Sequence, residues 1–120
     1  MTNQLVDLRL GTKVFAVRVI RLVKTLPSDK ASDVIGRQLL RSACSVGANY
    51  RAARRGRSKA EFIAKLGIVE EEADECIYWL ELLVEAGLMK LNMLAPLMNE
   101  ANEITAMIVA SIKKAKSSPD

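Results

Sequence analysis

The residues in this sequence best suited to chemistry are arginines that have no acidic neighbours. Between Asp33 and Glu61 the chain contains no acidic residue. The basic residues of the same interval are Arg37, Arg41, Arg51, Arg54, Arg55, Arg57 and Lys59. Arginine donates paired hydrogen bonds to phosphate oxygens, and the amides that open a helix add partial positive charge. The group from Arg51 to Lys59 therefore predicts a site that binds a nucleic-acid backbone without reading its sequence.

Ion pairing is the alternative role for the same side chains. The segment that follows is rich in carboxylates, namely Glu70, Glu71, Glu72, Asp74 and Glu75. Arg41 falls in mid-helix, so we expect it to pair with Glu72 or Glu75 rather than with a ligand. The arginines from Arg51 to Arg57 fall at a helix end and in a turn, where exposed side chains can either bind nucleic acid or form a solvated, ion-paired surface.

Most familiar catalytic chemistry is excluded. Histidine is absent, which removes Ser-His-Asp and Cys-His catalytic sets and zinc sites built on imidazole. The contiguous run Glu70 to Glu72 fans around a helix, so these side chains do not converge on a metal ion. Cys44 and Cys76 lack a CxxC neighbour, and we expect two small buried hydrophobic residues rather than a disulfide. The sequence predicts a protein that is not an enzyme and holds no metal or cofactor.

The charges divide between the two halves of the chain. The net charge is +4. Residues 1–65 hold 14 Lys and Arg against 4 Asp and Glu, a balance of +10, whereas residues 66–120 hold 4 against 10, a balance of −6. A basic half and an acidic half can neutralise each other or face different partners.

Four stretches with apolar residues at helical spacing must position these charges. We expect helices over residues 8–26, 32–55, 58–86 and 92–116, in a single domain that spans residues 1–120. The first helix should stop before Pro27, Ser58 and Glu61 match the capping-box pattern, and Gly87 favours a helix end. Long helices with short connectors predict an all-α fold, an up-down-up-down four-helix bundle.

Apolar residues also flank the main stripe of several helices, for example Val17 and Ile68. Such a wide apolar perimeter favours a homo-oligomer. Gly36, Gly47 and Gly67 fall inside predicted helices, where each costs about 1 kcal/mol relative to alanine. We expect close approach of helices to compensate for that cost.

The sequence shows no targeting signal. Residues 1–10 lack a basic region followed by an apolar run, and no segment is apolar over the length that a membrane span requires. We therefore expect a cytoplasmic protein with no membrane partner.

A motif of small and polar residues occupies the middle of the chain. It runs from Gln38 to Ala43 (QLLRSA) and from Ser45 to Ala53 (SVGANYRAA), and continues with Ser58, Glu61-Phe62, Lys65-Leu66, Glu72-Ala73, Glu75 and the run from Tyr78 to Leu83. Earlier positions that belong to it are Phe15, Leu22 and Leu26-Pro27. In these residues the sequence resembles the four-helix-bundle family named after the intervening-sequence protein of bacterial 23S ribosomal RNA genes.

The resemblance implies a bacterial protein that assembles into a ring-like homopentamer. The family also includes, by similarity, the accessory protein of diversity-generating retroelements, a basic pentamer that works with a reverse transcriptase and nucleic acid. The implied partners are RNA or DNA and a protein such as a nucleic-acid enzyme. The family usually has an acidic residue where this chain has Ala52, and the following run from Arg54 to Arg57 is unusually basic.

Two functions are consistent with these features. In the first, the basic turn from Arg51 to Lys59 is repeated around a ring, so that weak phosphate contacts add up. In the second, the protein is an oligomeric protein-interaction scaffold without a nucleic-acid role, and its basic and acidic halves meet at subunit contacts.

Overall fold

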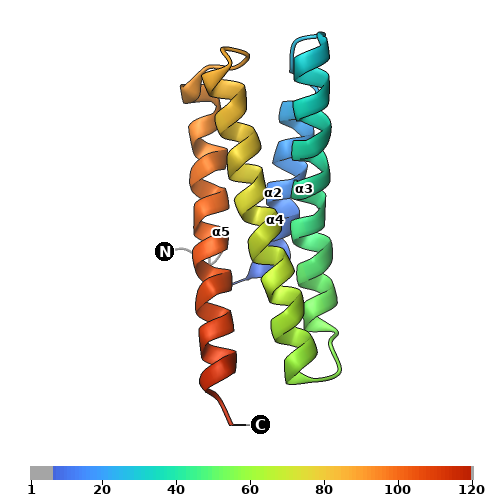
Figure 1. The fold of residues 1–120 in the computed structure, drawn as a ribbon, viewed down its shortest axis with the longest axis vertical. Coiled ribbons are helices and arrows are strands. Elements are labelled where there is room, and N and C mark those ends of the chain that lie inside the picture. Colours follow the sequence, from blue (N-terminus) through green and yellow to red (C-terminus); the bar gives the residue numbers. More distant parts are fainter. Residues whose placement is uncertain (1–6, 120) are drawn as a thin grey trace.

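The computed structural model describes residues 7–119, which form four α-helices and no strand (Figure 1). The helices are α2 (Leu8–Val23), α3 (Lys30–Arg54), α4 (Lys59–Glu85) and α5 (Leu91–Ser117). Successive helices run in opposite directions and pack side by side, and α2 also contacts α5. Among these residues the diagonal pairs, α2 with α4 and α3 with α5, have no Cα atoms within 8 Å of each other. The expected all-α fold with four helices is confirmed.

Side chains from the preceding residue cap three of the helices. Asp7 accepts the amide of Arg9 at 3.1 Å at the start of α2, and Asp29 accepts the amide of Ser32 at 2.7 Å at the start of α3. The cap of α4 is Ser58, whose hydroxyl accepts an amide hydrogen bond at 3.1 Å. These bonds satisfy amides that have no partner within their own helix.

Replacing Ser58 with alanine is expected to lower the free energy of unfolding by about 1 kcal/mol, because an amide in the first turn of α4 loses its acceptor. The urea midpoint of unfolding measures the change. Ser28→Ala is the matched control, since Ser28 is exposed and lies between helices. Equal midpoints for the two variants would contradict a capping role for Ser58.

The first helix ends earlier than its apolar spacing predicts. Regular helix stops at Val23 rather than at residue 26. The amides of Thr25 and Leu26 donate to carbonyls three residues back, at 2.9 and 3.2 Å, so the chain tightens into turns before Pro27. Proline disfavours helical geometry in the residue before it, and the tightening begins within that last turn.

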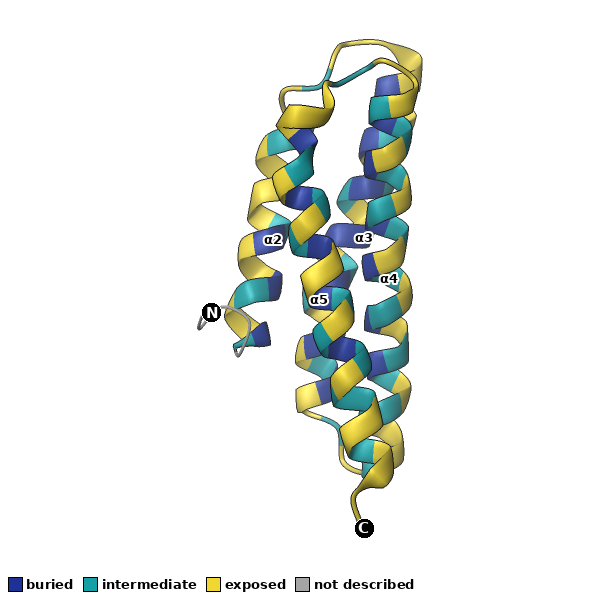
Figure 2. Cartoon of the chain, turned by 90° about the vertical axis from the view of Figure 1, so that its left-hand side faces the viewer, coloured by how far each residue is buried: buried dark blue, intermediate teal, exposed yellow. Residues whose placement is uncertain are grey.

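The core runs between all four helices (Figure 2). Its largest fully buried side chains include Phe15 on α2, Leu39 on α3, Leu66 and Leu80 on α4, and Ile108 on α5. Helix α2 has 16 residues whereas the others have 25 to 27. Figure 2 shows that α4 and α5 extend past the N-terminal end of α2. No helix among residues 7–119 is long and apolar enough to cross a membrane.

Two of the three helical glycines lie at a close helix approach. A Cβ atom at Gly36 would come within 2.9 Å of Leu26 Cδ1, and one at Gly47 within 3.5 Å of Thr12 Oγ1. At Gly67 no such atom lies within 4 Å. The expectation of close packing is therefore wrong for Gly67 within a single chain.

Candidate nucleic-acid interface

The turn between α3 and α4 carries several of the arginines that the sequence singles out. Helix α3 ends at Arg54, Arg55 is its C-cap, and Ser58 opens α4. The Glu61 carboxylate accepts the backbone amide of Arg57 at 2.8 Å, one residue earlier than the capping-box pattern places it. The side of the turn that leads into α4 therefore contains a fixed negative charge.

The structure divides the five predicted binding residues between two places. Those that line a groove beside α2 are Arg51, Arg54 and Arg55. Arg57 and Lys59 do not line it. The Lys59 ammonium donates to the carbonyl oxygen of Ser118, at the end of α5. The basic run in the sequence is therefore not one continuous site in the fold.

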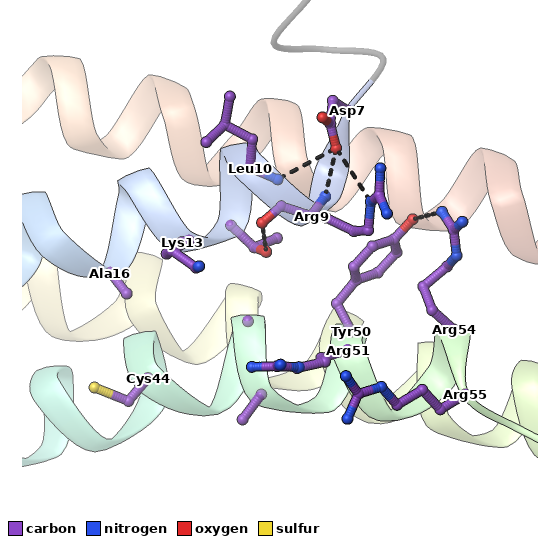
Figure 3. Close-up of a pocket in the computed structure, with 13 residues that line it drawn as sticks. Asp7, Arg9, Leu10, Lys13, Ala16, Cys44, Tyr50, Arg51, Arg54 and Arg55 are labelled. Atoms are coloured by element: carbon purple, nitrogen blue, oxygen red, sulfur yellow. Dashed lines mark hydrogen bonds and ion pairs between the residues drawn. The ribbon is translucent and has the colours of Figure 1, made fainter.

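The groove lies between α2 and α3 and has a volume of about 750 Å³ (Figure 3). Five cationic side chains line it from the two helices, and they are Arg9, Lys13, Arg51, Arg54 and Arg55. A single carboxylate, Asp7, also lines it. The arrangement concentrates positive charge in a concave surface, which attracts an anionic ligand more strongly than the same charges spread over a flat face.

Sequence reasoning missed two of these cations, Arg9 and Lys13. They lie on α2, about forty residues before Arg51 in the chain, and are one helical turn apart, so they point to the same side of α2. One signal was available, because residues 8–23 contain four basic residues and no acidic one. Nothing in the sequence pattern indicated that this side of α2 would face the arginines of α3.

The one carboxylate at the groove is already engaged. An oxygen of Asp7 accepts the amides of Arg9 and Leu10 at 3.1 and 3.3 Å and lies 3.7 Å from the Arg9 guanidinium. Among residues 7–119, Lys13 and Arg51 form no ion pair with any carboxylate. Positive charge in the groove therefore exceeds what the chain itself neutralises.

The groove has a floor of small side chains, which leaves room for a ligand between the cationic walls. Floor residues are Ala16 on α2 and Cys44, Gly47 and Ala48 on α3. Cys44 is exposed, so the expectation that both cysteines are buried is wrong for this one. Position 44 lies on the outward side of α3, where core packing does not reach. Cys76 is buried, and burial raises the pKa of its thiol to about 12.

One wall of the groove carries the aromatic ring of Tyr50, which is only 7% exposed. Its hydroxyl accepts a hydrogen bond from Arg54 Nη1 at 3.5 Å (Figure 3). A ring buried to this extent offers no face on which a base can stack. The groove therefore suits phosphates rather than bases.

The structure brings Arg41, Glu72 and Glu75 together in a separate cluster between α3 and α4. Arg41 Nη1 lies 3.2 Å from Glu72 Oε1, and Arg41 Nη2 donates to Glu75 Oε1. The same oxygen of Glu75 accepts the hydroxyl of Ser42 at 2.8 Å and the indole N–H of Trp79 at 3.3 Å. These contacts connect the two helices and leave Arg41 outside the groove.

This cluster makes stability depend on pH. The hydrogen bond from Ser42, followed by those from Trp79 and Arg41 and the positive charge of Arg41, holds the pKa of Glu75 below its ordinary value against the opposing effect of burial. A carboxylate whose pKa is lower in the folded state contributes stability above its unfolded pKa, about 4.3, and loses it as pH falls through the folded pKa.

Glu75→Gln is therefore expected to lower the free energy of unfolding at pH 7 by about 0.5 kcal/mol, since solvent screens a side chain that is 42% exposed, and to reduce its loss in acid. Urea unfolding at pH 7 and pH 3 measures both effects. Glu81→Gln, on an exposed face of the same helix, is the control. A variant with the same pH dependence as the parent would contradict this role of Glu75.

Comparison with known proteins agrees with the fold and identifies the family. The family model described as 23S rRNA-intervening sequence protein matches residues 11–110. A solved structure from Bacteroides thetaiotaomicron VPI-5482, a protein of unknown function from the S23 ribosomal protein family, shares 36% sequence identity with this chain. The two superpose with a TM-score of 0.84, over 89% of this chain and 99% of that one. No curated protein matches the sequence. The resemblance seen in the sequence is confirmed: the chain belongs to the family of 23S rRNA-intervening sequence proteins.

Proposed function

We propose that this protein binds the phosphate backbone of RNA or DNA in the groove between α2 and α3, without catalysing a reaction, and that it does so as a ring-like homo-oligomer. The observation that carries the proposal is the gathering of five cations from two helices around one groove, whose single carboxylate is engaged in capping α2. The homopentameric size is an implication of the family resemblance.

The chemistry of the groove favours a polyanion over a small neutral ligand. Guanidinium and ammonium groups neutralise phosphates and release condensed counterions, which supplies binding energy without regard to base sequence. One groove of about 750 Å³ holds only a short stretch of backbone. Repetition of the groove around a ring would add such weak contacts through effective concentration.

Fluorescence anisotropy of labelled single-stranded and duplex RNA and DNA, measured over a range of salt concentrations, tests the proposal. We expect binding at low salt for all sequences of one length, with the logarithm of the affinity falling linearly with the logarithm of salt concentration. In the triple variant Arg51→Ala/Arg54→Ala/Arg55→Ala, the magnitude of that slope should fall by about 2 to 3 for each subunit that binds.

The matched control is the triple variant Lys30→Ala/Arg37→Ala/Lys90→Ala. It removes the same charge near the other end of the bundle, from the start of α3 and from the residue before α5. The proposal predicts nearly unchanged binding for this control. No binding by the parent protein at low salt, or equal losses in both variants, would reject the groove as the site.

An oligomeric interaction scaffold is the second candidate function, with a protein such as a nucleic-acid enzyme as partner. Exposed apolar side chains favour it, because Leu10 is 54% exposed and Tyr78 is 52% exposed. A pull-down from the native host, with identification of the bound protein and nucleic acid, tests this candidate. If the pull-down yields a protein partner but no nucleic acid, and the anisotropy assay shows no binding, the scaffold function is favoured.

A further inference from the structure

The outward face of α2 is apolar as well as its core face. Leu10, Val14 and Val17 are exposed, and they point away from the buried residues of the same helix, such as Phe15 and Val19. Together with Arg21 and Lys24 they follow each other at spacings of four and three residues, the pattern of a helix seam that packs against another helix. A surface helix usually has one apolar face, so a second apolar stripe on the opposite side indicates that a partner covers it.

The charges beside this α2 stripe all have one sign. The basic residues of α2 are Arg9, Lys13, Arg18 and Arg21. Arg18 pairs with Glu100 on α5, whereas Lys13 and Arg21 have no ion-pair partner among residues 7–119. A partner that covers the stripe should therefore present both apolar and acidic side chains.

The outward face of α4 has that composition. Ile68, Glu71, Tyr78, Leu82 and Glu85 lie on one side of the helix at helical spacing. Glu75, at the edge of this side toward α3, is held by Arg41. Ile68 and Tyr78 are exposed, and the exposed side chains beside them include Glu71, Asp74, Glu81 and Glu85. From Leu66 to Glu85 the helix contains no basic residue.

Gly67 leaves an open position beside this face of α4. This glycine lies one residue before Ile68, in mid-helix, and a Cβ atom there would meet no neighbour within 4 Å. Glycine weakens a helix, and in this bundle the other two helical glycines, Gly36 and Gly47, lie opposite α2 and the turn that follows it. Gly67 has no such neighbour within its own chain.

The two faces belong to opposite sides of the molecule. Helices α2 and α4 are diagonal in the bundle, and none of their Cα atoms lie within 8 Å of each other. They run in the same direction and end at the same end of the bundle (Figure 1). Arg21 lies in the last turn of α2 and Lys24 is its C-cap, while Glu81 and Glu85 lie in the last turns of α4, so these charges belong to the same end of the bundle. A neighbouring copy placed side by side, without a shift along the bundle axis, brings these opposite charges together.

We infer that a second copy of this chain covers α2, and that it does so with the outward face of its α4. The contact is head-to-tail, because each copy offers α2 to one neighbour and α4 to the other, and such contacts generate rings when the rotation closes. The inference deepens the oligomeric part of the proposed function, on which it rests, by assigning the two surfaces. The contact borders the α2/α3 groove, because Leu10 belongs to the covered stripe and also lines that groove.

Two variants that each block one face test this assignment. Val14→Glu/Val17→Glu places carboxylates on the α2 stripe, where they meet the acidic face of α4. Ile68→Glu/Tyr78→Glu replaces the two exposed apolar residues of the α4 stripe. All four positions are exposed and glutamate is a good helix former, so each variant should keep its helical circular dichroism. Sedimentation equilibrium then gives the mass of each sample.

We expect the parent protein to be a multimer and each variant alone to sediment as a monomer of 13.2 kDa. An equimolar mixture of the two variants should form a dimer of twice that mass and nothing larger, because one intact α4 face meets one intact α2 face and the remaining faces repel. The exposed double variant Val34→Glu/Met93→Glu, outside both stripes, should assemble like the parent.

Three results would overturn the assignment. One is a monomeric parent protein, which would also remove the oligomer from the proposed function. Another is loss of assembly in the α2 variant but not in the α4 variant, which indicates a symmetric α2 contact. The third is a mixture that stays monomeric while both variants remain folded. Nucleic-acid binding is measured separately on the assembled parent, so its absence would reject the proposed function and leave the α2 to α4 contact intact.

Discussion

Reversing one cation on each wall of the groove, through Arg9→Glu combined with Arg51→Glu, is expected to weaken nucleic-acid binding by about 100-fold at low salt. Each substitution removes a phosphate contact and puts a carboxylate where a phosphate would lie. The salt slope should fall in magnitude by about 2 for each subunit that binds. A glutamate at position 9 suits the first turn of α2, and Arg51 is exposed, so the fold should tolerate both changes.

A pair with the same change in net charge separates the groove from general electrostatics. Lys30→Glu/Lys90→Glu alters two exposed residues toward the other end of the bundle, and we expect binding to weaken only slightly. The single variants are also informative. If Arg9→Glu alone behaves like Lys30→Glu, α2 does not contribute a wall to the site. If both double variants lose affinity equally, only net charge acts.

Phe15→Ala is expected to lower the free energy of unfolding by about 3 to 5 kcal/mol, a large share of the 5 to 15 kcal/mol typical of a domain. Phe15 is fully buried, and the other buried residues of α2 are Leu8, Thr12 and Val19. Because α2 is the shortest helix, the cavity removes a large part of what holds it to the bundle. Urea unfolding followed by circular dichroism measures the loss.

The same variant connects stability to binding. Loosening α2 would move Arg9 and Lys13 away from the arginines of α3, so nucleic-acid affinity should fall although no cation is replaced. Phe15→Leu fills most of the space and should retain most of the stability and affinity. A Phe15→Ala protein whose urea midpoint matches that of the parent would contradict the packing of α2 described above.

The helices themselves could be predicted from local features. Apolar spacing located all four, and Ser58 marked the start of α4 because a capping hydroxyl needs only residues within its own turn. The prediction was less accurate for the end of α2, where tight turns over Thr25 and Leu26 replace regular helix. The last residue of a helix depends on which type of turn forms there, and the spacing of apolar residues does not indicate the turn type.

The candidate site could be predicted only in part. The density of arginines in the sequence singled out Arg51, Arg54 and Arg55, which line the groove, together with Lys59, which contacts the end of α5 instead. Proximity along the chain is a poor guide at a helix end, since successive residues point about 100° apart around the axis. Arg9, far away in the sequence, joined the site instead.

Residue types and their spacing were enough to predict the four helices, the family and the split between a basic and an acidic half, and to exclude histidine chemistry. These properties depend on residue type and on spacing within one helix. Tertiary structure decided which charges act together: Arg9 and Lys13 face Arg51 across a groove, Arg41 meets Glu72 and Glu75, and Cys44 is exposed whereas Cys76 is buried. The physical reason is that helical periodicity defines the faces of each helix, whereas burial of side chains such as Phe15 selects which faces of two helices meet.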